Sequence, residues 1–362
     1  MDPLTHTLVG ASLAATRLGE KTRLAAPAMI IGANLPDVDV LAYTRGPDFA
    51  LGFRRGWTHG VLALVVLPAL LAIGLWLWDR WRNHRGSDPP LAAGWLFGLS
   101  YLAAATHPSL DWLNTYGMRW WMPFRDTWYY GDSVFIVDPW LWLILGAGWL
   151  LGRRATRTVV VISAAIVAWL TLMMLRRAPG YLPLVLVAIL VLVVALLWKP
   201  KSLFLTGPRS ALCGLILATL YIGSMIGLHT LTENRVRQEL NLAGVAPIQQ
   251  LMIGPRPANP LAWDVVARQD RLIRYGRFQW SGKGKLQLAE RHLPSARPSA
   301  IWQEIEASGQ AEGFLRWVRI PWIEIEDDKA LQRIHVRDAR YARRRRSGFG
   351  TALFELPTAG AE

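Results

Sequence analysis

The sequence predicts a mainly α-helical protein, a polytopic helical membrane bundle followed by an extramembrane domain of mixed α/β structure. Hydrophobic residues make up 52% of the 362 residues and charged residues only 18%, whereas soluble domains average about a quarter charged residues. Four apolar segments approach the roughly 20 residues that a membrane-spanning helix needs. After His229 the long apolar segments stop, and short alternating runs indicate half-buried strands.

The apolar segments differ in length, and their lengths decide what is expected of each. Four are long enough to span a membrane: Gly60–Trp78, Val159–Leu175, Tyr181–Trp198 and Ala211–His229. Leu91–Thr106 and Phe135–Leu151 are shorter and are expected to span while packed inside the bundle. Leu8–Leu18 and Leu24–Leu35 are shorter still and are expected to be half-buried helices. We therefore expect a membrane domain at 1–150, further transmembrane helices at 151–229 and a soluble domain at 230–362.

Basic residues in the loops predict the orientation of the bundle. Twelve lie in one alternating set of loops: Arg17, Lys21, Arg23, Arg80, Arg82, Arg85, Arg153, Arg154, Arg157, Lys199, Lys201 and Arg209. The opposite loops hold seven, spread over more residues: Arg45, Arg54, Arg55, Arg119, Arg125, Arg176 and Arg177. The positive-inside rule places the first set in the cytoplasm and residues 230–362 outside it. Arg176 and Arg177 fit this topology less well, so Val159–Trp198 can instead form a re-entrant hairpin.

The net charge of +14 and the single cysteine narrow the function classes. Residues 230–362 hold 21 of the 40 basic and 15 of the 26 acidic residues. The remaining excess lies in loops, where membrane topology accounts for it, so we expect contact with membrane lipids and no nucleic-acid partner. The run "RRRR" at 343–346 suits phosphate or lipid headgroups, or is a solvated basic turn. Cys213 alone excludes an internal disulfide and a cysteine-based zinc cluster.

Histidine and aspartate gather in four short stretches of the apolar region. These are "DPLTH" (2–6), "NLPDVD" (34–39), "RRGWTHG" (54–60) and "HPSLDWLNTYG" (107–117). Under the predicted topology each lies at a segment end on the non-cytoplasmic side, although the loop charges did not involve these residues. Charged groups near a bilayer tend to be paired or functional. The candidate metal ligands are therefore His6, Asp37, Asp39, His59, His107 and Asp111.

These residue types suit a divalent metal, because imidazole nitrogen and carboxylate oxygen bind Zn and Mn. His107 and Asp111 stand four apart, on one face of a helix in which Pro108 fits the first turn. Asp37 and Asp39 follow Pro36, and in an extended chain they point the same way and can share or bridge ions. We expect two ions, with Zn favoured over Mn. Singly, each residue also has an ordinary structural explanation, such as a helix cap or an ion pair of Asp111 with Arg119 or Arg125.

At these residues the sequence resembles the predicted membrane-bound, metal-dependent hydrolases of bacteria, the YdjM-like family. The resemblance extends through "MPF" (122–124) and "IVDPW" (136–140) and covers roughly the first 140 residues. It implies a multi-pass protein of the inner membrane. A more distant likeness is to helical zinc nucleases and bacterial phospholipases C, which use an early histidine, an aspartate, a later histidine and a His-x-x-x-Asp helix. Those proteins add a second such helix and an N-terminal amine, and here Asp2 stands in the place of the amine.

The sequence thus suggests hydrolysis of a phosphoester, lipid or lipid-linked, at the outer face of the membrane. His6, Asp39, His59, His107 and Asp111 are the expected catalytic metal ligands, and Asp2 and Asp138 are expected to orient them. The cations expected to bind the substrate anion, or to anchor the chain at headgroups, are Arg54, Arg55 and Arg125. The stretch "RWWMPFRDTWYY" (119–130) is an interfacial aromatic belt or the wall of a lipid cleft. Two rival classes are an ion- or proton-coupled transporter and a membrane-anchored scaffold with a structural metal. No pattern indicates an oligomeric state.

Overall fold

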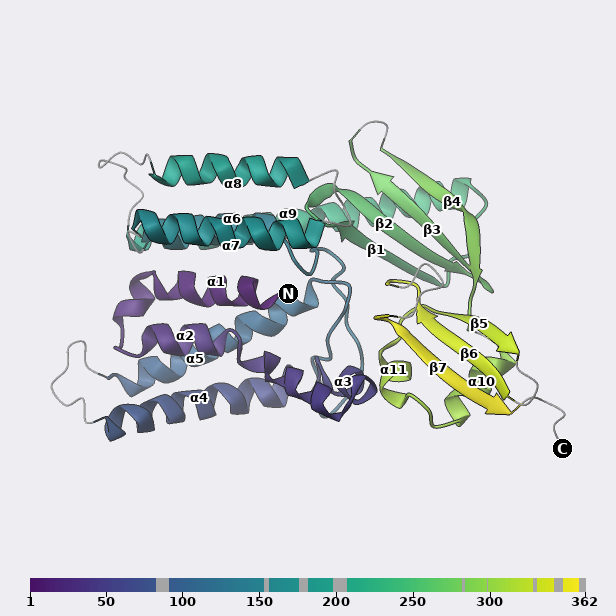
Figure 1. Ribbon diagram of the computed structural model, residues 1–362, viewed down its shortest axis with the longest axis horizontal. Coiled ribbons are helices and arrows are strands. Elements are labelled where there is room, and N and C mark those ends of the chain that lie inside the picture. The colour runs from purple at the N-terminus through teal and green to yellow at the C-terminus, as the bar shows by residue number, and fades with distance from the viewer. Residues whose placement is uncertain are drawn as a thin grey trace. The chain divides into compact units, whose positions relative to one another are not determined.

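The computed structural model describes residues 1–82, 91–152, 156–175, 182–197, 207–281, 284–297, 299–327, 331–341 and 348–357. The chain forms two compact units. The first unit comprises Met1–Val38, Arg55–Gly227 and Arg256–Pro260, and the second comprises Asp39–Arg54, Leu228–Pro255 and Leu261–Glu362. The first is helical, and the second contains two sheets and short helices, which confirms the predicted mainly helical fold with a mixed C-terminal part (Figure 1). The predicted boundaries at residues 150 and 229 stay predictions.

The first unit is built from helices along the chain. They are α1 (Pro3–Ala14), η1 (Arg17–Glu20), α2 (Ala25–Gly32), α4 (Val61–Trp81), α5 (Ala93–Trp112), α6 (Pro139–Gly152), α7 (Arg157–Leu175) and α8 (Leu182–Leu197). The 3-10 helix η2 (Leu35–Arg45) begins in this unit, and α9 (Pro208–Leu242) begins here and ends in the second. Helix α1 packs on α2 and α6, while α5 packs on α2 and α4.

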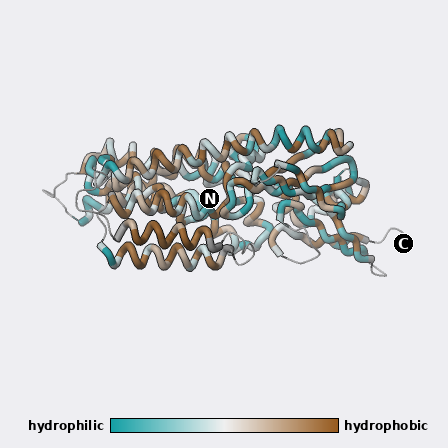
Figure 2. The backbone as a smooth tube through the Cα atoms, turned by 90° about the horizontal axis from the view of Figure 1, so that it is seen from above, coloured by the Kyte–Doolittle hydropathy of each residue, from teal (hydrophilic) through white to brown (hydrophobic). Residues whose placement is uncertain are grey.

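Two described helices, α4 and α9, are long and apolar enough to cross a membrane, and the bent pair α2–η2 would make a third. Helices α6, α7 and α8 are apolar but shorter in their described parts. Hydrophobic residues cover the helices of the first unit along their length (Figure 2). Many apolar side chains point outward from α4, among them Val65, Leu70 and Leu77. An outward apolar surface of this kind suits a hydrocarbon environment.

Close helix contacts depend on glycine. A Cβ atom on Gly148 of α6 would lie 2.9 Å from the Cα atom of Gly214 in α9 and 3.1 Å from the Ser210 carbonyl oxygen. A Cβ atom on Gly10 of α1 would lie 2.5 Å from the Met29 carbonyl oxygen of α2. Small residues let membrane helices approach this closely.

We expect Gly148→Leu to destabilise the first unit by about 1–3 kcal/mol, because a side chain there must push α6 and α9 apart. Gly74→Leu in α4 is the matched control, since nothing lies within 4 Å of the position of its added Cβ atom. Unfolding of the detergent-purified protein by heat or SDS measures the difference. Equal stability of the two variants would contradict the tight α6–α9 contact.

The second unit contains two antiparallel sheets. The first has the order β1 (Gln250–Arg256), β2 (Asn259–Gln269), β3 (Leu272–Gln279) and β4 (Lys285–Pro294), and the second has the order β5 (Pro321–Asp327), β6 (Leu331–Asp338) and β7 (Thr351–Pro357). Helices α10 (Ala300–Ala307) and α11 (Glu312–Trp317) separate them in sequence. Val266, Ile273, Leu293, Ile320 and Trp322 bury a shared apolar core.

Helix α3 (Pro47–Phe53) belongs to the second unit because it packs on α11. The Asp48 carboxylate accepts hydrogen bonds from the backbone N–H groups of Gly313 and Phe314, at 3.1 and 2.7 Å. It therefore satisfies donors at the start of α11, which begins without a capping side chain of its own.

The structure corrects two local predictions. The stretch 314–326 was expected to be extended throughout, but Phe314–Trp317 completes α11 and the strand begins only at Pro321. An alternation that short does not separate a helical turn from a strand. Pro108 was expected in a first helical turn, but it lies inside α5, which runs on to Trp112. The helix tolerates it because only one backbone donor is lost.

Several sequence predictions concern residues outside the described ranges. They are those for His84, Arg85, Arg153, Arg154, Arg176, Arg177, Lys199, Lys201 and the run at 343–346. The orientation derived from the loop charges therefore stays a prediction.

Candidate metal centre

Helix α5 supplies two of the candidate ligands from one face. His107 and Asp111 are four residues apart, and both side chains are fully buried. The His107 Nε2 atom lies 3.3 Å from an Asp111 carboxylate oxygen. The helical spacing predicted from the sequence thus holds although Pro108 lies between the two residues.

His59 reaches the same place from the turn between α3 and α4. Its backbone N–H and that of Gly60 both donate to the Gly56 carbonyl, at 3.1 and 2.7 Å. A Cβ atom on Gly60 would lie 2.5 Å from the Met122 carbonyl oxygen, so only glycine lets the chain at 118–122 pack against this turn. Backbone bonds from Arg119 to Arg55 and from Val61 to Trp120 fasten the two segments together.

Asp37 comes from η2, and here the structure corrects the extended geometry expected after Pro36. Residues 35–45 form a 3-10 helix, whose dihedral angles suit the fixed φ of proline. With three residues per turn, side chains two apart diverge. The Asp37 side chain therefore joins His107, while Asp39 is buried and binds Arg54 Nε at 2.9 Å. The proposed ligand role of Asp39 stays a prediction.

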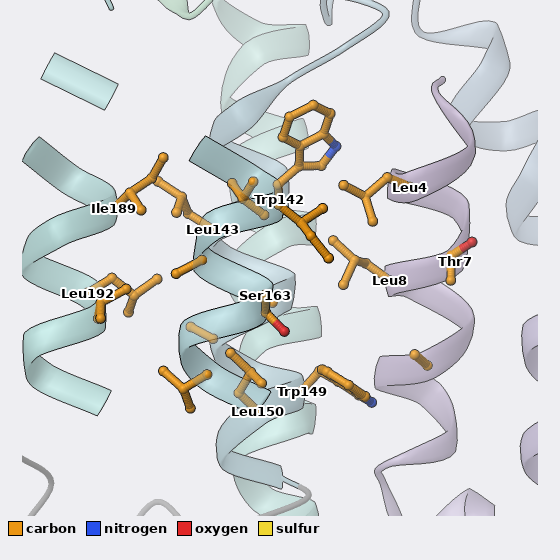
Figure 3. A pocket seen from close by; sticks show the side chains of 18 residues that line it. Leu4, Thr7, Leu8, Trp142, Leu143, Trp149, Leu150, Ser163, Ile189 and Leu192 are labelled. Atoms are coloured by element: carbon orange, nitrogen blue, oxygen red, sulfur yellow. The ribbon is translucent and has the colours of Figure 1, made fainter. Parts of the chain in front are cut away.

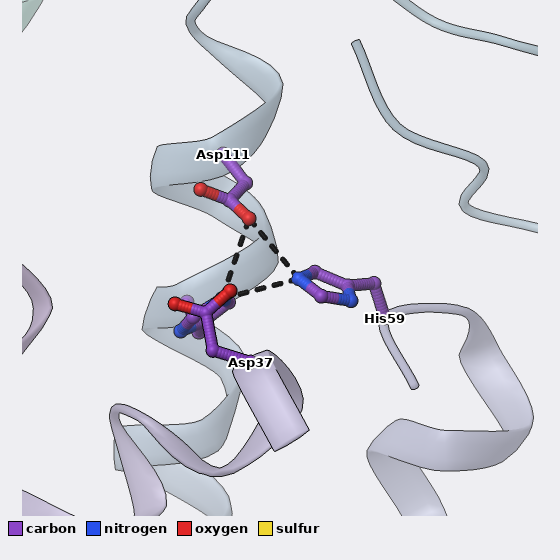
Figure 4. Close-up of side chains that lie close together, drawn as sticks. Asp37, His59 and Asp111 are labelled. Carbon is purple, nitrogen blue, oxygen red and sulfur yellow. Dashed lines mark hydrogen bonds and ion pairs between the residues drawn. The ribbon is translucent and has the colours of Figure 1, made fainter. Parts of the chain in front are cut away.

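Asp37, His59, His107 and Asp111 each offer one ligand atom, and these atoms all lie within 4.8 Å of one another. Figure 4 shows Asp37, His59 and Asp111 pointing toward one another from three separate segments. The His59 Nε2 atom lies 3.1 Å from both His107 Nε2 and Asp111 Oδ2, and His107 Nε2 lies 3.7 Å from Asp37 Oδ1. Bonds of about 2.0–2.2 Å place the ligands of a tetrahedral zinc ion about 3.3–3.6 Å apart. The residues present therefore fit a metal ion.

The imidazole rings are oriented from behind. His107 Nδ1 lies 2.7 Å from the Ala33 carbonyl oxygen, which only accepts, so Nδ1 carries the proton and Nε2 presents a lone pair to the group. His59 Nδ1 lies 2.9 Å from the Thr58 hydroxyl, which can accept in the same way. Two lone pairs 3.1 Å apart beside two carboxylates repel one another unless a cation lies between them.

His6 of α1 lies beside this group. Its Nε2 atom is 3.2 Å from Asp111 Oδ1, and its ring stacks on that of His107 with centroids 3.7 Å apart. Its buried Nδ1 atom has no hydrogen-bond partner among the described residues. Burial lowers the pKa of His6 well below its usual value, and the nearby His107 and other cationic groups lower that pKa further. His6 is thus a neutral imidazole next to the group, as a metal ligand has to be.

Two cations contact the Asp111 carboxylate. Arg55 Nε lies 3.0 Å from Oδ2, and the N-terminal amine of Met1 contacts Oδ1. Arg55 is buried, adopts a positive φ of 56° and lies over the Tyr116 ring. The other two arginines expected at the substrate lie elsewhere: Arg54 pairs with Asp39, and Arg125 is exposed. Anion binding by all three stays a prediction.

Asp2 and Asp138 have well-defined partners that are not histidines. The Asp2 carboxylate caps α1 by accepting from Thr5 and also accepts from Trp142 Nε1 at 3.1 Å. Asp138 accepts from the Trp140 backbone and the Tyr221 hydroxyl, each at 2.8 Å. Burial raises the pKa of the Asp138 carboxyl to about 6. Their expected roles in orienting a ligand histidine stay predictions.

Some of the groups that shape the site were not predicted. Thr58 and the Ala33 carbonyl orient the histidines, and Arg119 is fully buried under the His59 turn, paired with Asp126 at 2.8 Å. The sequence signals were present but weak: Thr58 directly precedes a candidate ligand, and Arg119 lies in the aromatic stretch read as a belt. A backbone carbonyl such as that of Ala33 leaves no signal in the sequence.

A family model described as YdjM inner membrane protein matches residues 1–180, which include every residue of this group. No curated protein and no solved structure matches the chain.

Proposed function

The chain belongs, through residues 1–180, to the YdjM inner membrane protein family, and on that premise we propose that it is a metal-dependent hydrolase of a phosphoester. The observation that carries the proposal is the buried group of Asp37, His59, His107 and Asp111, whose nitrogen and oxygen atoms converge at metal-ligand spacing. Its imidazole and carboxylate ligands suit Zn first and Mn second.

The chain's own residues divide the work at this site. A divalent ion held there would polarise the ester and lower the pKa of water. Arg55 fixes the Asp111 carboxylate, and Thr58 and the Ala33 carbonyl fix the two imidazoles. The side chain of Asp37 is 20% exposed, whereas those of His59, His107 and Asp111 are fully buried. Substrate and water therefore reach the group from the side of Asp37.

The substrate class and location complete the proposal. Because the group belongs to the first unit of a membrane protein, a lipid or lipid-linked phosphoester at the outer face of the inner membrane is the substrate we propose. One ion fits the four-residue group, and a second, with His6 and Asp39 as further ligands, is the expectation from the sequence.

Metal analysis and hydrolysis test the proposal together. We expect one or two Zn or Mn ions per chain in protein purified without chelator, and hydrolysis of bis(p-nitrophenyl) phosphate that EDTA abolishes and added metal restores. A chain without bound metal would overturn the site. Bound metal with no hydrolysis of phosphate mono- or diesters would overturn the hydrolase and leave transport or a structural role.

We expect Thr58→Val to weaken zinc binding about 10–100-fold, the usual cost of losing a hydrogen bond behind a ligand histidine. The substitution keeps the shape of the side chain and removes the hydroxyl that lies 2.9 Å from His59 Nδ1. Thr58→Ser, which keeps a hydroxyl, is the control. Competition with a chromogenic chelator measures both affinities, and equal affinities in the two variants would contradict the orienting role.

A further inference from the structure

An apolar pocket lies among α1, α6, α7 and α8 of the first unit, apart from the residues of the metal group. Its volume is about 240 Å³. Figure 3 shows Leu8, Leu143 and Leu150 around it, with Trp142 and Trp149 toward opposite ends of the view. Protein interiors rarely leave voids larger than a water molecule, so a space of this size calls for an occupant.

The lining excludes water as that occupant. It contains no charged residue, and its polar groups are engaged elsewhere. Thr7 Oγ1 donates to the Pro3 carbonyl at 2.8 Å, and Trp142 Nε1 donates to Asp2 and Thr5. A buried water needs two to four polar partners, and an apolar cavity of about 150 Å³ stays dry and binds benzene instead.

The surroundings identify the kind of apolar occupant. The neighbouring helices expose apolar side chains such as Ile166 and Leu190, so in a membrane their outer surfaces contact lipid hydrocarbon. We propose that the pocket binds an acyl chain of a membrane phospholipid. The binding needs no hydrolytic activity and can therefore hold or fail independently of the proposed function.

Helix α1 connects this pocket to the metal group. Leu4, Leu8 and Ala11 of α1 line the pocket, while His6 of the same helix contacts Asp111. Trp142 lines the pocket with its ring and holds the N-terminal cap of α1 through its indole N–H. An acyl chain in the pocket would thus pack against the helix that positions His6.

Gly146 offers a direct test, because it lines the pocket and nothing lies within 4 Å of the position of an added Cβ atom. Gly146→Leu therefore fills the space without a backbone clash. Gly223→Leu in α9 is the matched control, since its added Cβ atom is equally free and Gly223 does not line the pocket. Ala164→Leu on α7 is a second filling variant if Gly146→Leu fails to fold.

The full chain is reconstituted in vesicles of phosphatidylethanolamine and phosphatidylglycerol that carry a phospholipid with a diazirine in its acyl chain. We expect photolabelling of α1, α6 and α8 peptides that line the pocket in the wild type and in Gly223→Leu. Gly146→Leu should lower that labelling about ten-fold, the effect of displacing two buried methylene groups. Equal labelling of these peptides in both variants would overturn the proposal, as would labelling by a free diazirine fatty acid and not by the phospholipid.

Discussion

His59→Ala is expected to abolish the metal-dependent part of the protein's stability together with metal binding. His59 offers Nε2 to the group from a separate turn, 3.1 Å from both His107 Nε2 and Asp111 Oδ2. A ligand that binds only the folded state stabilises it by about 2.7 kcal/mol at a free concentration 100 times Kd. EDTA should therefore lower the unfolding temperature of the wild type by several degrees and leave that of His59→Ala unchanged.

His59 is a sharper choice for this experiment than Asp111. The Asp111 carboxylate also binds Arg55 and the Met1 amine, so its removal would leave buried cations unpaired and would destabilise the fold on its own. His292→Ala, at an exposed histidine of the second unit, is the control and should keep the EDTA response. Full metal content and an unchanged EDTA response in His59→Ala would refute the ligand assignment.

The parts of the site that follow from local periodicity were predictable from the sequence. His107 and Asp111 lie on one face because a helix returns every 3.6 residues, whatever surrounds it. The meeting of His59 and Asp37 with that helix was predictable in outline, since alternating apolar segments bring every second loop to the same side. The positions of individual atoms in the loops were not, because they depend on contacts distant in sequence.

Asp39 and Arg55 show where that limit lies. Both were assigned roles from residue type and neighbourhood alone, and Asp39 was grouped with Asp37 on an extended backbone that the structure replaces by a 3-10 helix. Arg55 was expected at a substrate anion, whereas its printed geometry is an ion pair with Asp111, made from a backbone with positive φ. Neither a register within a short helix nor a left-handed turn is written in a hydropathy pattern.

The fold of the second unit depends on a buried ion pair whose loss gives the largest stability effect we expect. Asp338 at the end of β6 is fully buried and accepts from the Arg319 backbone N–H at 2.7 Å and from Arg340 Nη2 at 2.8 Å. The Arg340 guanidinium is also buried and lies 4.6 Å from the Trp317 ring centroid. Asp338→Ala leaves this cation without its carboxylate and should cost about 3–5 kcal/mol.

Thermal unfolding of the full chain, or the rate of proteolysis within residues 228–357, measures that loss. Glu355→Ala is the control, because its pair with Arg333 is about half exposed on both sides and an exposed pair contributes only about 0–1 kcal/mol. The double variant Asp338→Ala with Arg340→Met separates the two causes of the effect. If the unpaired charge dominates, the double variant recovers stability, and if the lost backbone hydrogen bonds dominate, it stays as unstable as Asp338→Ala. A cost for Asp338→Ala no larger than that for Glu355→Ala would contradict both, since a fully desolvated pair and a solvated one cannot be equally dispensable unless water reaches Arg340.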